Sequence, residues 1–258
     1  MNKILNFLGH KIAPIIRAYR SFVVKKQFKL GISENENNYI ETLFFDHNQI
    51  CQNFEYRDQS WDSIKYIGRL MWNDLFYIMP FFQKKHIEPN FPTENLKVVF
   101  KQDEFICKSS GMKNDWVFLK NGCMMDVPYS VEFQAKIFHE NSEFQFAFHY
   151  QSIGNRYRFN LKKNKKISFE VIEKGCFHND IFEVPLTLSI GEWTSFKITI
   201  FNDKYIYSVN NNIILSIKKI KKFNIKKDMC FAIILWDSDN SNIHTCYKDL
   251  KIYKIIEG

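Results

Sequence analysis

The stretch that decides the fold is Val131-Glu132-Phe133-Gln134-Ala135-Lys136-Ile137. Its apolar residues occupy every second position, and polar or charged residues stand between them. Successive side chains of a strand point to opposite faces of a sheet. The run therefore predicts a strand with one face in a core and the other face open.

The same alternation recurs on the C-terminal side of this run. It is found in 144–150, 157–161, 167–171 and 196–200, and further strands are expected in 96–105, 116–119, 205–212, 231–235 and 244–252. Turn-forming residues separate the runs, as in Asn202-Asp203 and Asn210-Asn211-Asn212. Roughly eight to twelve such strands are typical of a sandwich. The sequence predicts a mainly β protein, a two-sheet antiparallel jelly-roll sandwich with an N-terminal helical region.

Residues from about 115 to 254 resemble the concanavalin A-like lectin/glucanase superfamily, especially its laminin-G-like members. The resemblance rests on Gly154-Asn155-Arg156-Tyr157-Arg158-Phe159, Gly191-Glu192-Trp193-Thr194, the hairpin Tyr205 to Asn212 and the closing run Tyr247 to Ile252. It implies two antiparallel sheets, with ligands bound on a concave sheet face or at its rim. Laminarinase-type members carry Glu-x-Asp-x-x-Glu on one strand, which gives two carboxylates at glycosidase separation. No Glu-x-Asp occurs in this chain, which disfavours an enzyme of that type.

Three segments are predicted along the chain. Residues 1–33 form a basic amphipathic helix, residues 34–92 a mixed region that contains a helix, and residues 93–258 the concanavalin A-like sandwich. In the middle region, Tyr39 to Ile50 is either a strand or a short helix. A helix is expected from Trp61 to Met79, since Ser60 is a good N-cap and Pro80 a terminator.

The basic charge is concentrated in the first segment. Residues 1–33 hold seven of the lysines and arginines and no acid, whereas the whole chain has a net charge of +8. Apolar residues from Ile4 to Val23 recur at helical spacing. Pro14 either kinks this helix or starts a second one, and Gly31 is the expected stop. The helix either packs on the protein or on a second subunit, or lies peripherally on an anionic membrane surface through residues 1–30. Nucleic acid is disfavoured, because no recognised reader motif accompanies the charge.

The protein is expected in the cytoplasm, with an alternative at the membrane periphery. Its six cysteines are widely spaced, unlike a small secreted scaffold, so we expect free thiols. No convincing signal peptide is present. No stretch of about 18 uncharged apolar residues exists.

The face opposite the Phe and Tyr side chains holds the main candidate ligand-binding residues. They are Gln145, His149, Arg156, Arg158 and Asn160. These side chains offer directional hydrogen bonds to hydroxyl groups, and arginine can hold an anionic group with two bonds. The alternative is an ordinary solvated sheet face, or one covered by the N-terminal region.

A polar loop supplies further candidates: Trp236, Asp237 and Asp239. A tryptophan beside carboxylates and amides can stack on a sugar ring and bind its hydroxyls. The same oxygens suit Ca²⁺, although a turn needs such residues anyway.

Two mirror-ordered pairs, Cys176 with His178 and His244 with Cys246, are weak candidates for Zn²⁺. Their spacing is not a recognised zinc pattern, so no cofactor is expected. The sequence thus favours non-catalytic recognition of a glycan or polysaccharide. A glycoside hydrolase or lyase with an atypical site, and a protein-interaction or assembly module with a protein partner, are the alternatives.

Overall fold

The computed structural model describes most of the chain. The described residues are 13–31, 39–52, 54–59, 96–100, 104–110, 116–121, 127–140, 142–152, 155–163, 165–173, 176–220, 230–237 and 242–257. Every structural statement below concerns these residues.

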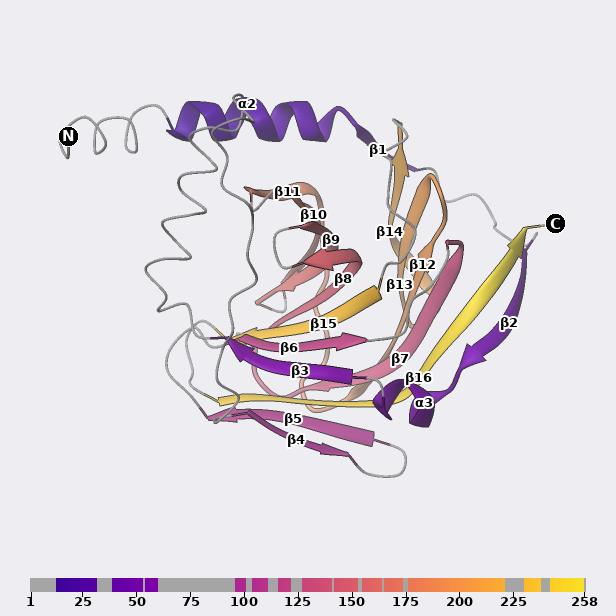
Figure 1. The fold of residues 1–258 in the computed structure, drawn as a ribbon. Helices are drawn as coiled ribbons and strands as arrows, with labels where there is room; N and C mark the ends of the chain where they lie inside the picture. The colour runs from indigo at the N-terminus through magenta and orange to yellow at the C-terminus, as the bar shows by residue number, and fades with distance from the viewer. Residues whose placement is uncertain are drawn as a thin grey trace.

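The described strands form two antiparallel sheets (Figure 1), which confirms the predicted two-sheet sandwich. Sheet A has the order β1 (Phe28–Leu30), β14 (Asn212–Lys219), β13 (Lys204–Val209), β12 (Trp193–Ile200), β7 (Tyr129–Ile137), β16 (Asn242–Glu257), β5 (Glu104–Ser110) and β4 (Leu96–Phe100), and β2 (Tyr39–Phe45) also pairs with β16. Sheet B has the order β11 (Cys176–Pro185), β10 (Lys166–Glu173), β9 (Asn155–Lys162), β8 (Ser142–Ser152), β15 (Cys230–Asp237), β6 (Trp116–Asn121) and β3 (Phe54–Gln59). Sheet A curves around sheet B.

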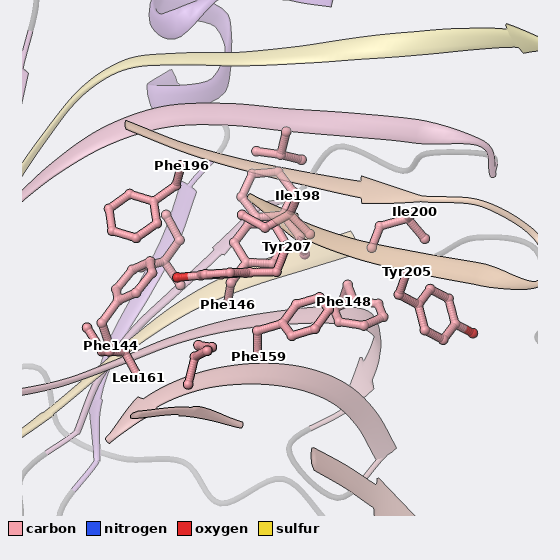
Figure 2. Packing of buried hydrophobic residues seen from close by; sticks show 14 of the residues in the cluster. Phe144, Phe146, Phe148, Phe159, Leu161, Phe196, Ile198, Ile200, Tyr205 and Tyr207 are labelled. Carbon is pink, nitrogen blue, oxygen red and sulfur yellow. The ribbon is translucent and has the colours of Figure 1, made fainter. Parts of the chain in front are cut away.

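The core lies between the two sheets and is rich in aromatic rings (Figure 2). Phe133 of β7 stacks on Phe196 of β12 with ring centroids 5.2 Å apart, and Phe146 of β8 stacks on Phe231 of β15 at the same separation. Phe144 of sheet B meets Phe196 of sheet A at 5.4 Å. Each of these rings belongs to the apolar residues that occupy every second position of an alternating run. The alternation in the sequence therefore identifies the sheet faces that point into the core.

The N-terminal helix ends earlier than predicted. Helix α2 spans Ala13–Lys25, and Pro14 stands in its first turn, where a missing N–H costs nothing. The chain then enters β1 instead of continuing to Gly31. Phe28 explains the change, because its buried ring packs on Phe169 of sheet B at 5.1 Å while β1 pairs with β14.

Strands from before residue 93 complete both sheets. Tyr39 to Ile50 contains both predicted alternatives, since β2 is followed by helix α3 (His47–Gln52). Strand β2 extends sheet A, and β3, which was not predicted, extends sheet B through its pairing with β6. The helix predicted from Trp61 to Met79 lies outside the described residues.

Helix α2 lies against the edge of sheet B, above β11 (Figure 1). Within the described ranges, no helix combines the length and the apolarity that a bilayer crossing requires.

Candidate functional site

Three of the predicted ligand-binding residues meet on the face of sheet B that points away from the core. Gln145 of β8 lies opposite Asn160 of β9 in the strand register. The Arg158 guanidinium donates through Nη1 to Gln145 Oε1 at 2.7 Å. Arg156 belongs to the same phase of β9 and lies opposite Ile172 of β10.

The expectation that this face is open is wrong. Gln145, Arg156, Arg158 and Asn160 are between 1% and 4% exposed. Part of the cover comes from β11 and α2: the ring of Phe177 lies 5.7 Å from the Arg158 guanidinium, and Arg20 of α2 donates to the Phe177 carbonyl at 3.2 Å. The burial of this face therefore agrees with the alternative in which the N-terminal region covers it.

A carboxylate that the sequence did not mark as a site organises these side chains. Glu170 of β10 is fully buried and forms ion pairs with Arg158 and with Lys162, the latter at 2.6 Å. Ser168 Oγ donates to Glu170 Oε1 at 3.1 Å, and Asn160 Nδ2 donates to the same oxygen at 3.5 Å. We call Gln145, Arg158, Asn160, Lys162, Ser168 and Glu170 the Glu170 cluster.

The charged groups of the Glu170 cluster all have partners of opposite charge. Burial alone would raise the pKa of Glu170, but Arg158 and Lys162 outweigh it and hold the pKa below its ordinary value. Burial likewise opposes the charge of Lys162, whose pKa is nevertheless raised by Glu170 and Asp180. Asp180 also pairs with Lys162, at 2.7 Å, so two carboxylates balance the two cations. The cluster therefore fits a role in holding β8, β9 and β10 together. Ser168 and Glu170 are two residues apart on β10, so they lie on the same face of the strand. The alternation in the sequence is therefore the signal that could have identified Glu170 as part of this face.

His149 does not join the other predicted ligand residues. Its backbone φ is +48°, and the register of β8 and β9 shifts between Phe148 and Ser152. This bulge reverses the side-chain alternation and turns the imidazole into the space between the sheets, where its ring lies 5.4 Å from that of Tyr205. Burial, together with the charge of Lys219, lowers the pKa of His149 to about 3.

The predicted loop residues and metal ligands are dispersed. Trp236 and Asp237 belong to the end of β15, and Asp239 lies outside the described residues. Cys176 and His178 stand on β11 at the edge of sheet B, whereas His244 and Cys246 stand on β16 inside sheet A. The two pairs therefore occupy different sheets. Cys246 is buried, and the described residues contain no group of three or more His, Cys, Asp or Glu that could hold a metal ion.

The outer face of sheet A carries a polar hollow of about 310 Å³. Its lining consists of Glu132, Phe133, Gln134, Ser195, Phe196, Lys197, Asn211, Asp249 and Lys251. We call this site the polar hollow. Two irregularities shape it: the register of β16 against β7 shifts between Lys248 and Lys251, and Asn211 stands in the tight turn between β13 and β14.

The polar groups of the hollow are held in place by neighbours. Gln134 Nε2 donates to Asp249 Oδ2 at 3.0 Å. Lys197 lies 2.9 Å from Glu132 Oε1 and 2.6 Å from Glu41 Oε2. Burial opposes the charge of Lys197, but these two carboxylates raise its pKa above the ordinary value. The hollow thus presents fixed amide, carboxylate and ammonium groups at a partly exposed surface.

Trp193 lies beside the polar hollow, two residues before Ser195 on the same face of β12. The Nζ atoms of Lys136 and Lys248 lie 4.9 Å and 4.5 Å from its ring centroid, in cation–π contact. Among the described residues, neither lysine forms an ion pair. An indole ring, the two lysines that contact it and a polar hollow therefore adjoin one another on this face.

The sequence contained part of this site. The polar residues of the run that forms β7 are Glu132, Gln134 and Lys136. Because they are two residues apart, the sequence predicts that they share one face of the strand. Their neighbours Trp193 and Asp249 come from distant parts of the chain. No local pattern indicates that β12 and β16 flank β7.

A second hollow, of about 490 Å³, is apolar and lies where β2 pairs with β16. It includes Leu43, Phe44 and Ile256, which are each 52% exposed. The described structure contains nothing that covers it.

Comparison with known proteins shows the fold but no family. No protein-family model matches the chain, and no curated protein matches it. A Bacillus subtilis protein of unknown function with a galectin-like fold superposes with a TM-score of 0.54 and 6% identity, over 85% of this chain and 100% of that one. The carbohydrate-binding module CBM66 of Bacillus subtilis gives a TM-score of 0.49 at 13% identity, over 62% and 92% of the two chains. The carbohydrate recognition domain of Emp46p in its metal-free form gives 0.48 at 12% identity, over 61% and 85%.

Proposed function

We propose that this protein is a non-catalytic glycan-binding protein and that it binds its ligand in the polar hollow beside Trp193. The observation that carries the proposal is the juxtaposition of that hollow with an indole ring on the outer face of sheet A. The galectin-like fold is consistent with a lectin-like role. Predicted residues of the Glu170 cluster are assigned a structural role instead, because their side chains are buried.

The chemistry of the hollow suits a sugar. A pyranose ring presents apolar C–H groups on one face and hydroxyl groups around its edge, so it needs a flat apolar surface next to donors and acceptors. Trp193 supplies the surface. Gln134, Asn211 and Asp249 supply amide and carboxylate groups at the rim of the hollow.

The two lysines over Trp193 favour a glycan that carries an acidic group. Lys136 and Lys248 form no ion pair with a described carboxylate, and Lys251 adds a further cation to the lining. A carboxylate or sulfate on the sugar would gain charge-assisted hydrogen bonds from these ammonium groups. Their attraction is screened by salt, so binding of an acidic glycan should weaken as ionic strength rises.

The test is a glycan array with neutral and acidic oligosaccharides, followed by calorimetric titration of the strongest ligand. We expect Trp193→Ala to weaken binding by about tenfold or more, since loss of a stacking aromatic costs on the order of 1.5 kcal/mol. We expect the double variant K136A/K248A to lose affinity selectively for acidic oligosaccharides.

The double variant K166A/K218A is the matched control, because it removes two exposed lysines elsewhere on the sandwich. It should bind as the unaltered protein does. The absence of saturable binding to any oligosaccharide, or equal affinity in Trp193→Ala, would exclude the proposal. Release of a shortened sugar during incubation with the ligand, detected by mass spectrometry, would replace it with the hydrolase or lyase alternative.

A further inference from the structure

Helix α2 has one face that the sandwich already occupies. Arg20 and Val24 are each 1% exposed, and the Arg20 side chain donates to the Phe177 carbonyl on β11. Lys25 Nζ lies 5.6 Å from the ring centroid of Phe182, also on β11. These contacts fix how the helix is rotated about its axis.

The opposite face of α2 is apolar and exposed. Ile15, Tyr19 and Phe22 follow one another at intervals of four and three residues, which places them on one side of a helix. They are 69%, 58% and 55% exposed. We call these three residues the outer stripe. Exposing two aromatic side chains and an isoleucine side by side in water is unfavourable, so this face is suited to contact with an apolar phase.

The surroundings of the outer stripe are basic. Residues 13–31 contain Arg17, Arg20, Lys25, Lys26 and Lys29 and no acidic residue. Lys25, Lys26 and Lys29 are exposed, and Lys26 Nζ lies 4.3 Å from the ring centroid of Phe22. Cations at the margin of an apolar stripe match the arrangement of an anionic lipid surface, in which charged headgroups border the acyl chains.

We propose that α2 attaches the protein peripherally to an anionic membrane surface. The outer stripe enters the boundary between headgroups and acyl chains, while Lys26 and Lys29 contact the headgroups. The helix can do this without leaving the sandwich, because Arg20 and Val24 hold its other face. This attachment is independent of glycan binding, which takes place on the outer face of sheet A.

The test is flotation of the full chain with vesicles of phosphatidylcholine alone and of phosphatidylcholine with about one-third phosphatidylserine. We expect binding to the anionic vesicles that decreases in high salt. The variant I15S/Y19S/F22S should reduce the partition coefficient by about a hundredfold or more, since it removes three membrane-facing apolar side chains. Charge reversal in K26E/K29E should reduce binding to anionic vesicles and leave the weak binding to neutral vesicles unchanged.

The matched control is I40S/L43S/F44S on β2, whose three side chains are 68%, 52% and 52% exposed. It removes a comparable apolar surface away from α2 and should float like the unaltered protein. Equal flotation of I15S/Y19S/F22S, or equal loss in both triple variants, would overturn the proposal. So would a dimer in analytical ultracentrifugation without lipid that I15S/Y19S/F22S dissociates, because the outer stripe would then bind a second copy. Thermal unfolding of each variant verifies that it is folded.

Discussion

At the scale of single residues, Glu170 shows how a buried charge is tolerated in a sandwich. Its carboxylate has two cationic neighbours and two neutral donors, and it is fully buried. Removing one partner of such a network leaves the other charges buried without compensation, which costs far more than an exposed ion pair is worth. The cluster therefore contributes to the stability of sheet B because its buried carboxylate is paired with cations.

We predict that Glu170→Gln lowers the free energy of unfolding by about 3 kcal/mol or more, because the buried Arg158 loses its counter-charge and Lys162 keeps only Asp180. Urea denaturation at pH 7 measures the change. Glu183→Gln is the control, because the Lys166–Glu183 pair is exposed and such pairs contribute about 1 kcal/mol or less. Similar losses in the two variants would contradict the structural role of the cluster.

His149 makes the stability depend on pH. Its pKa is about 3 in the folded protein and near the ordinary value of 6.5 in the unfolded chain, so the unfolded state binds more protons between these values. Stability is then complete above pH 6.5 and decreases as the pH falls toward 3, by at most about 1.4 kcal/mol per pH unit.

The corresponding prediction is that His149→Asn abolishes most of this slope between pH 6.5 and 5, because asparagine does not titrate and tolerates a positive φ. Urea denaturation at several pH values is the measurement. His139→Asn, in the partly exposed segment after β7, should keep the slope of the unaltered protein. An unchanged slope in His149→Asn would show that another group causes it.

At the scale of elements, the polar hollow depends on two departures from regular strands. The turn between β13 and β14 has φ values of +48° at Asn210 and +64° at Asn211, as a two-residue hairpin turn of this hand requires. The bulge in β16 gives Asp249 a φ of +53°. Both irregularities bring polar side chains to the hollow while the strands around them keep their core contacts.

At Asn211, the backbone conformation serves the turn and the side chain serves the polar hollow, so the two roles can be tested separately. We predict that Asn211→Gly leaves the free energy of unfolding within about 1 kcal/mol of the original value, because glycine adopts the positive φ without strain. The same substitution removes an amide from the hollow and should weaken glycan binding several-fold. Urea denaturation and calorimetric titration provide the two measurements. Loss of stability without loss of affinity would show that Asn211 serves only the turn.

At the scale of the whole molecule, the sandwich presents two separate surfaces. The polar hollow lies on the outer face of sheet A, between β7, β12 and β16, and α2 lies beside β11 of sheet B. Figure 1 shows α2 and the central strands of sheet A on different parts of the molecule. A protein attached to a membrane through α2 could therefore keep the hollow accessible to a glycan.

The strand predictions from the sequence were good where a run alternates without interruption. In β7, β9, β10 and β12, the side chains that face the core are those that the alternation of apolar and polar residues predicts. The predicted two-sheet sandwich is confirmed. Prediction was poorer near Phe28, where burial of one ring replaced the end of a helix with a strand, and at His149, where a bulge reversed the alternation.

The sequence by itself determined which side chains of the uninterrupted alternating runs form the core, because the alternation of apolar and polar residues is a local property of each strand. It also determined the charge and the apolar stripe of the N-terminal segment. Only the tertiary structure decided which polar faces are open. The arginine-rich face of β9 is buried, whereas Gln134 and Asp249 meet at an open hollow beside Trp193. The physical reason is that the exposure of a sheet face depends on which distant strand or helix packs over it. The alternation of apolar and polar residues is the same in a strand whose polar face is covered and in one whose polar face is open.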